Sequence, residues 1–256
     1  MGLILKASGS DFEANAVSYL PPVAEGLMYW GFLNDSVAKL GRNFAPGGLP
    51  VSVVGSPEVS SAGAVLDVNR YIQTEVRQTP SMTLIVVGNP VLDGAEQGMF
   101  ISNYTSARPG VIAGISSGVS LYCGGDDPGD GKFRLNANVS SFSGVSGAPS
   151  SIRQASLFGI DIAKPAFLAM TFDASEKITR VFNLSTGDKA QTGAFTESVD
   201  IGVTPFRIGA SPLTSYPNRA KHQHFAAIYS RKLSEAELAL IYTRIKAYLA
   251  TRGVTV

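Results

Sequence analysis

The fold is decided by three stretches near the C-terminus: Phe206-Arg-Ile-Gly-Ala210, Phe225-Ala-Ala-Ile-Tyr229 and Ser234-Glu-Ala-Glu237. The first two are short and rich in apolar and aromatic residues, which is typical of β-strands. The third contains the S-x-x-E capping box of a helix start, in which each side chain satisfies an otherwise unpaired backbone N–H. The sequence therefore predicts two short strands followed by a terminal helix.

This helix is predicted over residues 234–252. Arg252-Gly253 supplies a cation near the negative end of the helix dipole and a residue suited to the C-terminal stop. The apolar residues before it recur at intervals of three and four, which places them on one face of the helix. We therefore expect the helix to cover an edge or a face of a β-structure. The apolar stripe consists of Leu238, Ile241, Ile245 and Leu249.

The rest of the chain has the pattern of an all-β protein. Residues 81–87 form a continuous run of mostly apolar and β-branched residues between Pro80 and Gly88, as expected of a buried strand. Residues 133–139 alternate between apolar and polar types, which indicates a strand with one buried face. Residues 167–172 and 178–184 flank a short polar turn and predict a β-hairpin.

Composition narrows the function classes. The chain of 256 residues has a formal net charge of +1, which favours neither nucleic acid nor an anionic membrane as a partner. Cys123 is the single cysteine, so an intrachain disulfide is excluded and folding in a reducing cytoplasm is expected. The N-terminus lacks the pattern of a secretory signal, and we see no apolar run long enough to span a membrane.

These strands and the terminal helix together resemble the concanavalin A-like lectin/glucanase (laminin-G-like) β-sandwich, in the form common in bacteriophage tail and other virion proteins. The resemblance implies an all-β, jelly-roll sandwich with an N-terminal extended arm and one C-terminal α-helix. We predict the arm over residues 1–25, up to the Pro21-Pro22 step, and one sandwich domain over residues 26–256. The arm is a candidate for contacts with a neighbouring subunit or with the virion.

Three patterns bear on catalysis, and none predicts a catalytic residue. Residues 114–118 match the G-x-S-x-G elbow around Ser116, but residues 119–123 predict a strand where that motif needs a helix. No glutamate starts the E-x-D-x-x-E pattern of the glucanase branch of this fold. His222 and His224 lie two residues apart, and a zinc site would need two further ligands that the sequence does not identify.

Metal and ligand candidates come from loops and aromatic residues. Asp126, Asp127 and Asp130 lie in a glycine-rich segment and could bind Ca²⁺ through carboxylate oxygens. Their spacing does not fit an EF-hand loop, and the composition favours a solvated turn. No other cofactor is predicted. Aromatic rings can stack on the apolar faces of sugars, and we expect Tyr104 and Tyr216 to do so first. The wider set of aromatic candidates is Trp30, Tyr29, Tyr104, Tyr122 and Tyr216.

The resemblance implies a non-enzymatic structural protein of a bacteriophage virion, in a tail fibre or tail tip, that recognises host cell-surface glycans. It also implies a homo-oligomer, with a trimer as in phage fibres, that binds other virion proteins. Such a protein is made in the host cytoplasm and released by lysis, without nucleic-acid binding or membrane insertion. Two alternatives stay open: a capsid-decoration or baseplate adaptor that binds no sugar, and a glycan hydrolase or esterase.

Overall fold

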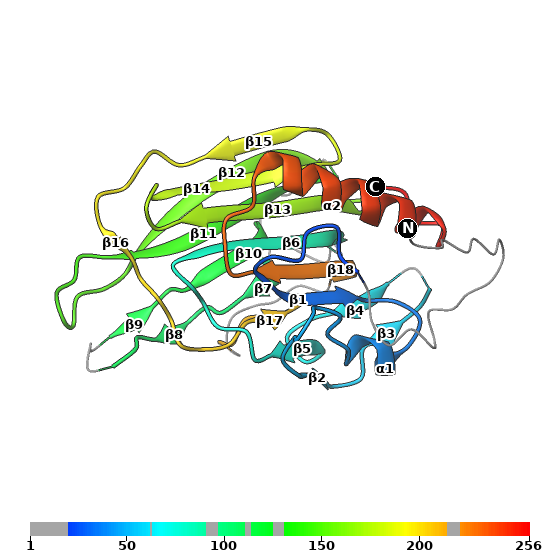
Figure 1. Cartoon of the computed structure of the whole chain (residues 1–256), viewed down its shortest axis with the longest axis horizontal. Helices are drawn as coiled ribbons and strands as arrows, with labels where there is room; N and C mark the ends of the chain where they lie inside the picture. Colours follow the sequence, from blue (N-terminus) through cyan, green and yellow to red (C-terminus); the bar gives the residue numbers. More distant parts are fainter. Residues whose placement is uncertain (1–19, 62, 91–96, 111–113, 125–130, 214–220) are drawn as a thin grey trace, which may run out of the picture.

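A computed structural model describes residues 20–61, 63–90, 97–110, 114–124, 131–213 and 221–256 of the chain. Two eight-stranded antiparallel sheets pack face to face, and one long helix lies on the outside of the first sheet (Figure 1). The predicted all-β sandwich with a C-terminal helix is therefore confirmed. The boundary between an arm and the sandwich at residue 25 stays a prediction.

The first sheet has the strand order β15-β14-β13-β6-β18-β4-β3, with β1 also paired to β18. The second has the order β12-β11-β10-β7-β17-β5-β2, with β16 also paired to β11, and β8 and β9 form a separate pair. The elements are β1 (Leu27–Phe32), α1 (Val37–Leu40), β2 (Val51–Val54), β3 (Glu58–Val59), β4 (Ala64–Leu66), β5 (Tyr71–Thr74), β6 (Ser81–Pro90), β7 (Gly98–Ser102), β8 (Ser106–Ala107), β9 (Ile115–Ser116), β10 (Val119–Gly124), β11 (Lys132–Phe142), β12 (Ser151–Asp161), β13 (Ala166–Asp173), β14 (Ile178–Asn183), β15 (Asp188–Gln191), β16 (Ser198–Val199), β17 (Arg207–Ile208), β18 (Lys221–Tyr229) and α2 (Glu235–Ala250).

The first sheet is buried on both faces, which explains the continuous apolar runs in its central strands. On β6, Leu84 and Val86 point into the core between the sheets, whereas Ile85 and Val87 point outward beneath α2. On β18, Ala226 and Ile228 face inward in the same way. A strand with two buried faces needs apolar residues at every position, so its sequence shows no alternation.

The terminal helix agrees closely with the prediction. Ser234 accepts a hydrogen bond from the backbone N–H of Glu237, and the Glu237 carboxylate accepts one from the backbone N–H of Ser234, so the capping box is complete. The helix ends at Ala250, and Arg252 lies beyond it in an ion pair with Asp35 at 3.1 Å. Arg252 is thus not the last-turn cation that we expected. The predicted apolar stripe is fully buried: Leu238, Ile241, Ile245 and Leu249.

The predicted strands are also present. β13 and β14 form the expected hairpin, with Leu168 opposite Asn183 and Asp173 opposite Ile178. β6 continues past the predicted end to Pro90. The segment after β1 contains the short helix α1, which begins because Ser36 accepts a hydrogen bond from the backbone N–H of Lys39.

One end of the sandwich is held by a buried ion pair between Arg108 and Asp200. The guanidinium donates from Nε and Nη2 to the two carboxylate oxygens, each at 2.9 Å, and the side chains are only 1% and 2% exposed. Arg108 also lies 3.7 Å from the centre of the Phe142 ring. Ser140 donates to the same carboxylate, and Ser116 donates to the Asp200 carbonyl. These contacts join segments that are far apart in the chain.

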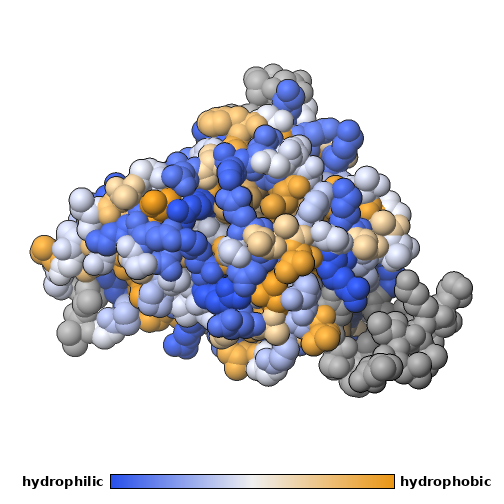
Figure 2. All heavy atoms as spheres, turned by 45° about the horizontal axis from the view of Figure 1, so that its top comes forward, coloured by the Kyte–Doolittle hydropathy of each residue, from blue (hydrophilic) through white to orange (hydrophobic). Residues whose placement is uncertain are grey.

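The outer surface is mixed in character. Hydrophilic and hydrophobic side chains are interspersed over the face that Figure 2 displays, which includes the side of the molecule near α2 and β15. Among the described helices, none is both long and apolar enough to cross a membrane.

We expect Asp200→Asn to lower the free energy of unfolding by about 3–5 kcal/mol, because it leaves the Arg108 guanidinium buried without its counter-charge. Urea denaturation followed by tryptophan fluorescence would measure the change. The control is Glu235→Gln, which removes one partner of the exposed Lys189–Glu235 pair and should change stability by less than about 1 kcal/mol. A loss in Asp200→Asn no larger than in the control would show that the buried pair does not hold the sandwich end.

We also expect Glu237 to make stability depend on pH in the acid range. The hydrogen bond from Arg231 is the main reason that the pKa of Glu237 falls from 4.5 to about 2. Because the folded-state pKa is the lower one, this stabilisation is complete above about pH 5 and is lost as the pH falls toward 2.

Glu237→Gln should therefore make the urea midpoint less dependent on pH over the same interval. Some dependence should remain, because the pKa of Asp173 is also lowered to about 2, mainly by the hydroxyl of Ser175. Glu235→Gln, on the same helical turn, is the control and should keep the parental dependence. An unaltered profile for Glu237→Gln would contradict the assignment.

Candidate functional site

The outward side chains of β10, β11 and β12 form the best candidate site. Helix α2 covers the outer face of the first sheet, whereas these strands of the second sheet present amides, hydroxyls, a guanidinium and one exposed ring on their outer side. The inward side chains of the same strands, such as Leu121, Leu135 and Ala155, belong to the core between the sheets. We call this surface the polar face and define it by Tyr122, Arg134, Asn136, Asn138, Gln154, Ser156 and Phe158.

A hydrogen-bond network fixes the side chains of the polar face. The Tyr122 hydroxyl donates to Gln154 Oε1 at 3.1 Å and accepts from Asn138 Nδ2 at 3.1 Å. Asn136 Oδ1 accepts two bonds, one from Gln154 Nε2 at 3.1 Å and one from the Ser156 hydroxyl at 2.7 Å. These residues stand opposite one another in the register of the three strands. The network therefore holds polar groups in place before any ligand binds.

Exposure differs sharply within this network. Asn136 is 0% exposed and Tyr122 5%, whereas Phe158 is 71% exposed, an unusual state for a phenylalanine. The guanidinium of Arg134 lies 5.8 Å from the centre of the Phe158 ring, so both side chains are on the same side of the sheet. The sequence predicted a half-buried strand over 133–139, but its polar positions are nearly as buried as its apolar ones. The polar face thus combines a buried layer of hydrogen-bonded side chains with an exposed aromatic ring.

Burial also changes the acid–base properties of this face. It raises the pKa of Tyr122 above its usual value, and the nearby phenol of Tyr104 acts in the same direction. The hydrogen bond from Asn138 and the positive charge of Arg134 oppose this shift. Tyr122 is therefore a neutral hydrogen-bonding group at physiological pH.

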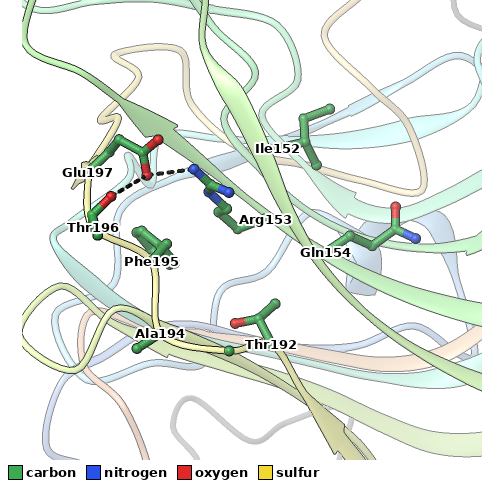
Figure 3. Close-up of a pocket in the computed structure, with 9 residues that line it drawn as sticks. Ile152, Arg153, Gln154, Thr192, Ala194, Phe195, Thr196 and Glu197 are labelled. Carbon is green, nitrogen blue, oxygen red and sulfur yellow. Dashed lines mark hydrogen bonds and ion pairs between the residues drawn. The ribbon is translucent and has the colours of Figure 1, made fainter.

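A groove of about 510 Å³ borders the polar face where β12 lies beside the segment between β15 and β16 (Figure 3). Across it Arg153 donates to Glu197 at 2.5 Å, and the Arg153 guanidinium lies 5.6 Å from the centre of the Phe195 ring. Gln154 lines the groove as well as the polar face. The groove and the polar face therefore share one amide side chain. The groove is lined by Ile152, Arg153, Gln154, Thr192, Gly193, Ala194, Phe195, Thr196 and Glu197.

The structure corrects one predicted ligand contact and leaves two others open. Trp30 is 0% exposed and packs edge-on against Phe225 beneath α2, so it cannot stack on a sugar. The Trp30 ring instead packs in the apolar core between α2 and the outer face of the first sheet. Tyr104 is half-buried near Tyr122, and its contact with a ligand stays a prediction. Tyr216 lies outside the described residues.

The structure describes the serine and histidine candidates but not the three aspartates. Ser116 lies on β9, is 0% exposed and donates to the Asp200 carbonyl, and strand β10 follows it instead of the helix that the elbow motif needs. His222 is exposed and His224 is buried on β18, so the two rings do not share one environment. Asp126, Asp127 and Asp130 lie outside the described residues. Within the described ranges, no three His, Cys, Asp or Glu side chains are grouped to hold a metal ion.

Sequence reasoning did not identify Arg134, Gln154 or Phe158. The stretch that forms β12 combines polar residues with Ile152 and Phe158, and nothing in that pattern says which face of the strand is covered. A glycine directly after Phe158, with a φ of +74°, marks a bulge in the pairing of β12 with β11. That glycine is the one local signal of an unusual position here.

Comparison with known proteins identifies the fold. No protein-family model matches the chain, and no curated protein matches its sequence. Among solved structures, the ligand binding domain of botulinum neurotoxin serotype D in complex with N-acetylneuraminic acid has a TM-score of 0.58 and 10% identity over 86% of this chain. The binding domain of botulinum neurotoxin DC in complex with rat synaptotagmin II gives 0.55 and 10% over 86%. A sialidase of Trypanosoma rangeli, in complex with 2,3-difluorosialic acid, gives 0.52 and 14% over 86%.

At such low identity these likenesses show the fold alone, a lectin-like β-sandwich. The chain spans about half the length of the toxin domains, with 51% and 52% covered, and 33% of the sialidase. The neighbours include a protein bound to a sugar acid and one bound to a protein receptor. The shared fold therefore assigns no ligand, partner or activity to this chain.

We expect Tyr122→Phe to lower the free energy of unfolding by about 1–2 kcal/mol, because Gln154 loses a donor and Asn138 loses an acceptor in a mostly buried network. Urea denaturation would measure the change. The control is Tyr71→Phe, at a half-buried tyrosine whose ring lies 4.4 Å from the Arg207 guanidinium and keeps that contact without its hydroxyl. Equal stability of the two variants would show that the Tyr122 hydroxyl does not organise the polar face.

Proposed function

We propose that this protein binds glycans through the polar face and has no catalytic activity there. The observation that carries the proposal is the exposed ring of Phe158 beside a set of hydrogen-bonded amides. An aromatic ring packs against the apolar C–H face of a sugar, and amides and hydroxyls bond its hydroxyl groups. Because the network already holds Gln154 and Asn138 in place, binding costs little side-chain ordering.

The chemistry of the polar face supports binding without hydrolysis. Its seven defining residues include no aspartate or glutamate, and glycoside hydrolysis commonly uses two carboxylates that flank the scissile bond. The groove contains one carboxylate, Glu197, which is already engaged by Arg153. The lectin-like fold adds support, since its neighbours include a domain bound to N-acetylneuraminic acid.

The proposal extends to the biological setting that the sequence resemblance implies. We place the protein in a tailed-bacteriophage virion, as a tail-fibre or tail-tip component that assembles as a homotrimer and contacts host glycans. Support for this part is the resemblance of the strand and helix patterns to phage virion sandwiches. Light scattering of the purified protein tests the trimer, and mass spectrometry of purified virions tests the location.

Phe158→Ala should weaken glycan binding about tenfold, because the stacking surface is lost. A glycan array would find the preferred saccharide, and isothermal titration calorimetry would measure its affinity. The control is Val145→Ala, which shortens another exposed apolar side chain, 64% exposed and outside the polar face. We expect this variant to bind like the parent.

Two outcomes would count against glycan binding at this site. A correctly folded oligomer that binds no glycan on the array would favour the architectural alternative, a virion adaptor without sugar binding. Binding that survives unchanged in Phe158→Ala would place the glycan elsewhere on the molecule.

A further inference from the structure

We infer that the groove between β12 and residues 192–197 is a second saccharide subsite, so that the protein selects neutral oligosaccharides long enough to reach it from Phe158. This inference rests on the proposed function, because it names the class of glycan that the polar face would take. β12 is an edge strand of the second sheet, and among the described residues only β11 pairs with it. The groove therefore opens at the side of the sandwich, next to the polar face (Figure 3).

The groove has the size of a ligand site and is open. Its volume of about 510 Å³ lies within the range of roughly 300–1,000 Å³ that is usual for small-molecule sites. A Cβ added to Gly193, which lines the groove, would meet no described heavy atom within 4 Å beyond its chain neighbours. The φ of Gly193 also lies outside the left-handed region, so this position accepts a side chain without backbone strain.

The lining of the groove carries the hydrogen-bonding groups that a sugar needs. Arg153 donates from Nη2 to Glu197 and from Nε to the Ser141 hydroxyl, which leaves Nη1 without an acceptor among the described residues. The Glu197 carboxylate can accept further bonds, because its two oxygens offer about four lone-pair sites. The Thr192 hydroxyl accepts from the backbone N–H of Thr179, so its own proton can be donated to a ligand. Donors and acceptors thus lie side by side, as neighbouring sugar hydroxyls require.

The charge of the groove favours a neutral ligand. Arg153 and Glu197 are the two charged residues of its lining, and they form an ion pair without net charge. An anionic sugar would be repelled by Glu197, and a cationic one by Arg153. Two neighbouring hydroxyls can instead bind to the intact pair, one accepting from the guanidinium and the other donating to the carboxylate. Such hydrogen bonds to charged groups are stronger than those between neutral groups.

The geometry of β12 sets the length of the ligand. Side chains at alternate positions of a strand share a face, so Ile152 and Gln154 at the groove stand in one row with Ser156 and Phe158. Four residues separate Gln154 from Phe158, a span of about 14 Å at the usual rise of a strand. One sugar ring is too short to contact both. An oligosaccharide that packs on Phe158 can follow the row and place its end in the groove.

The test measures affinity against chain length by isothermal titration calorimetry. The probes are three series of neutral linear oligosaccharides, built from glucose, galactose or N-acetylglucosamine, each from the disaccharide to the hexasaccharide. We expect the parent protein to bind its preferred series about tenfold more tightly once the chain reaches the groove. Gly193→Phe should abolish this gain, because the new ring occupies the groove, and should leave binding of the disaccharide unchanged. Phe158→Ala should instead weaken binding at every length.

Glu197→Gln is a second groove variant that adds no bulk. The glutamine keeps an acceptor for Arg153 but presents an NH₂ group in place of a carboxylate oxygen, so the gain from chain length should again fall. The control is Ala239→Phe, which adds the same ring as Gly193→Phe at an exposed position of α2, on the outside of the first sheet. This variant should keep the full gain.

Two outcomes would overturn the inference. One is an affinity of the parent that does not change with chain length, and the other is a gain that either groove variant retains in full. In both cases, disaccharide binding that depends on Phe158 would leave the proposed function intact. Failure of every saccharide to bind would overturn both.

Discussion

The burial of the first sheet on both faces is the constraint on which the rest of the structure depends. β6 and β18 lie at its centre, with the intersheet core on one side and helix α2 on the other. Removal of so much apolar surface from water is the largest favourable contribution to folding. It also places helix α2 on the first sheet, so the outward side chains of the second sheet are free to be polar. The candidate site therefore follows from where the helix packs.

Polar contacts between segments far apart in the chain then fix which segments meet, which apolar burial alone does not specify. The Arg108–Asp200 pair joins the residue after β16 to the residue after β8. The Ser140 hydroxyl donates to its carboxylate, and its guanidinium donates to the Ala148 carbonyl. A buried ion pair is tolerated only when its geometry and its further hydrogen bonds offset the loss of hydration. The polar face obeys the same rule through Tyr122, Asn136 and Gln154. Two buried amide atoms of the face, Asn136 Nδ2 and Asn138 Oδ1, are exceptions, because they have no hydrogen-bond partner among the described residues.

The fold and the function of this protein have to be argued separately. Similar sandwiches occur in toxin domains bound to a sugar acid or to a protein receptor, and in a sialidase. A sheet face or a groove between edge strands can be fitted with different side chains while the core stays the same. In this chain that surface carries an exposed ring, a guanidinium and fixed amides, which are the groups that the proposed glycan-binding site would use.

Local patterns of residues were enough to predict the elements whose signals are local. The capping box at Ser234 and Glu237, the apolar stripe of α2, and the hairpin of β13 and β14 depend on residues close together in the chain, so their patterns predicted them correctly. Burial and pairing across the chain are different, because they depend on which segments meet. Trp30 is a core residue because β1 lies beneath α2. Phe158 is exposed because it lies on the outer side of the second sheet, and the pattern of its own strand does not indicate which side is covered. The partnership of Arg108 with Asp200, separated by 92 residues, was likewise decided only by the tertiary structure, since side chains so far apart leave no shared pattern in the sequence.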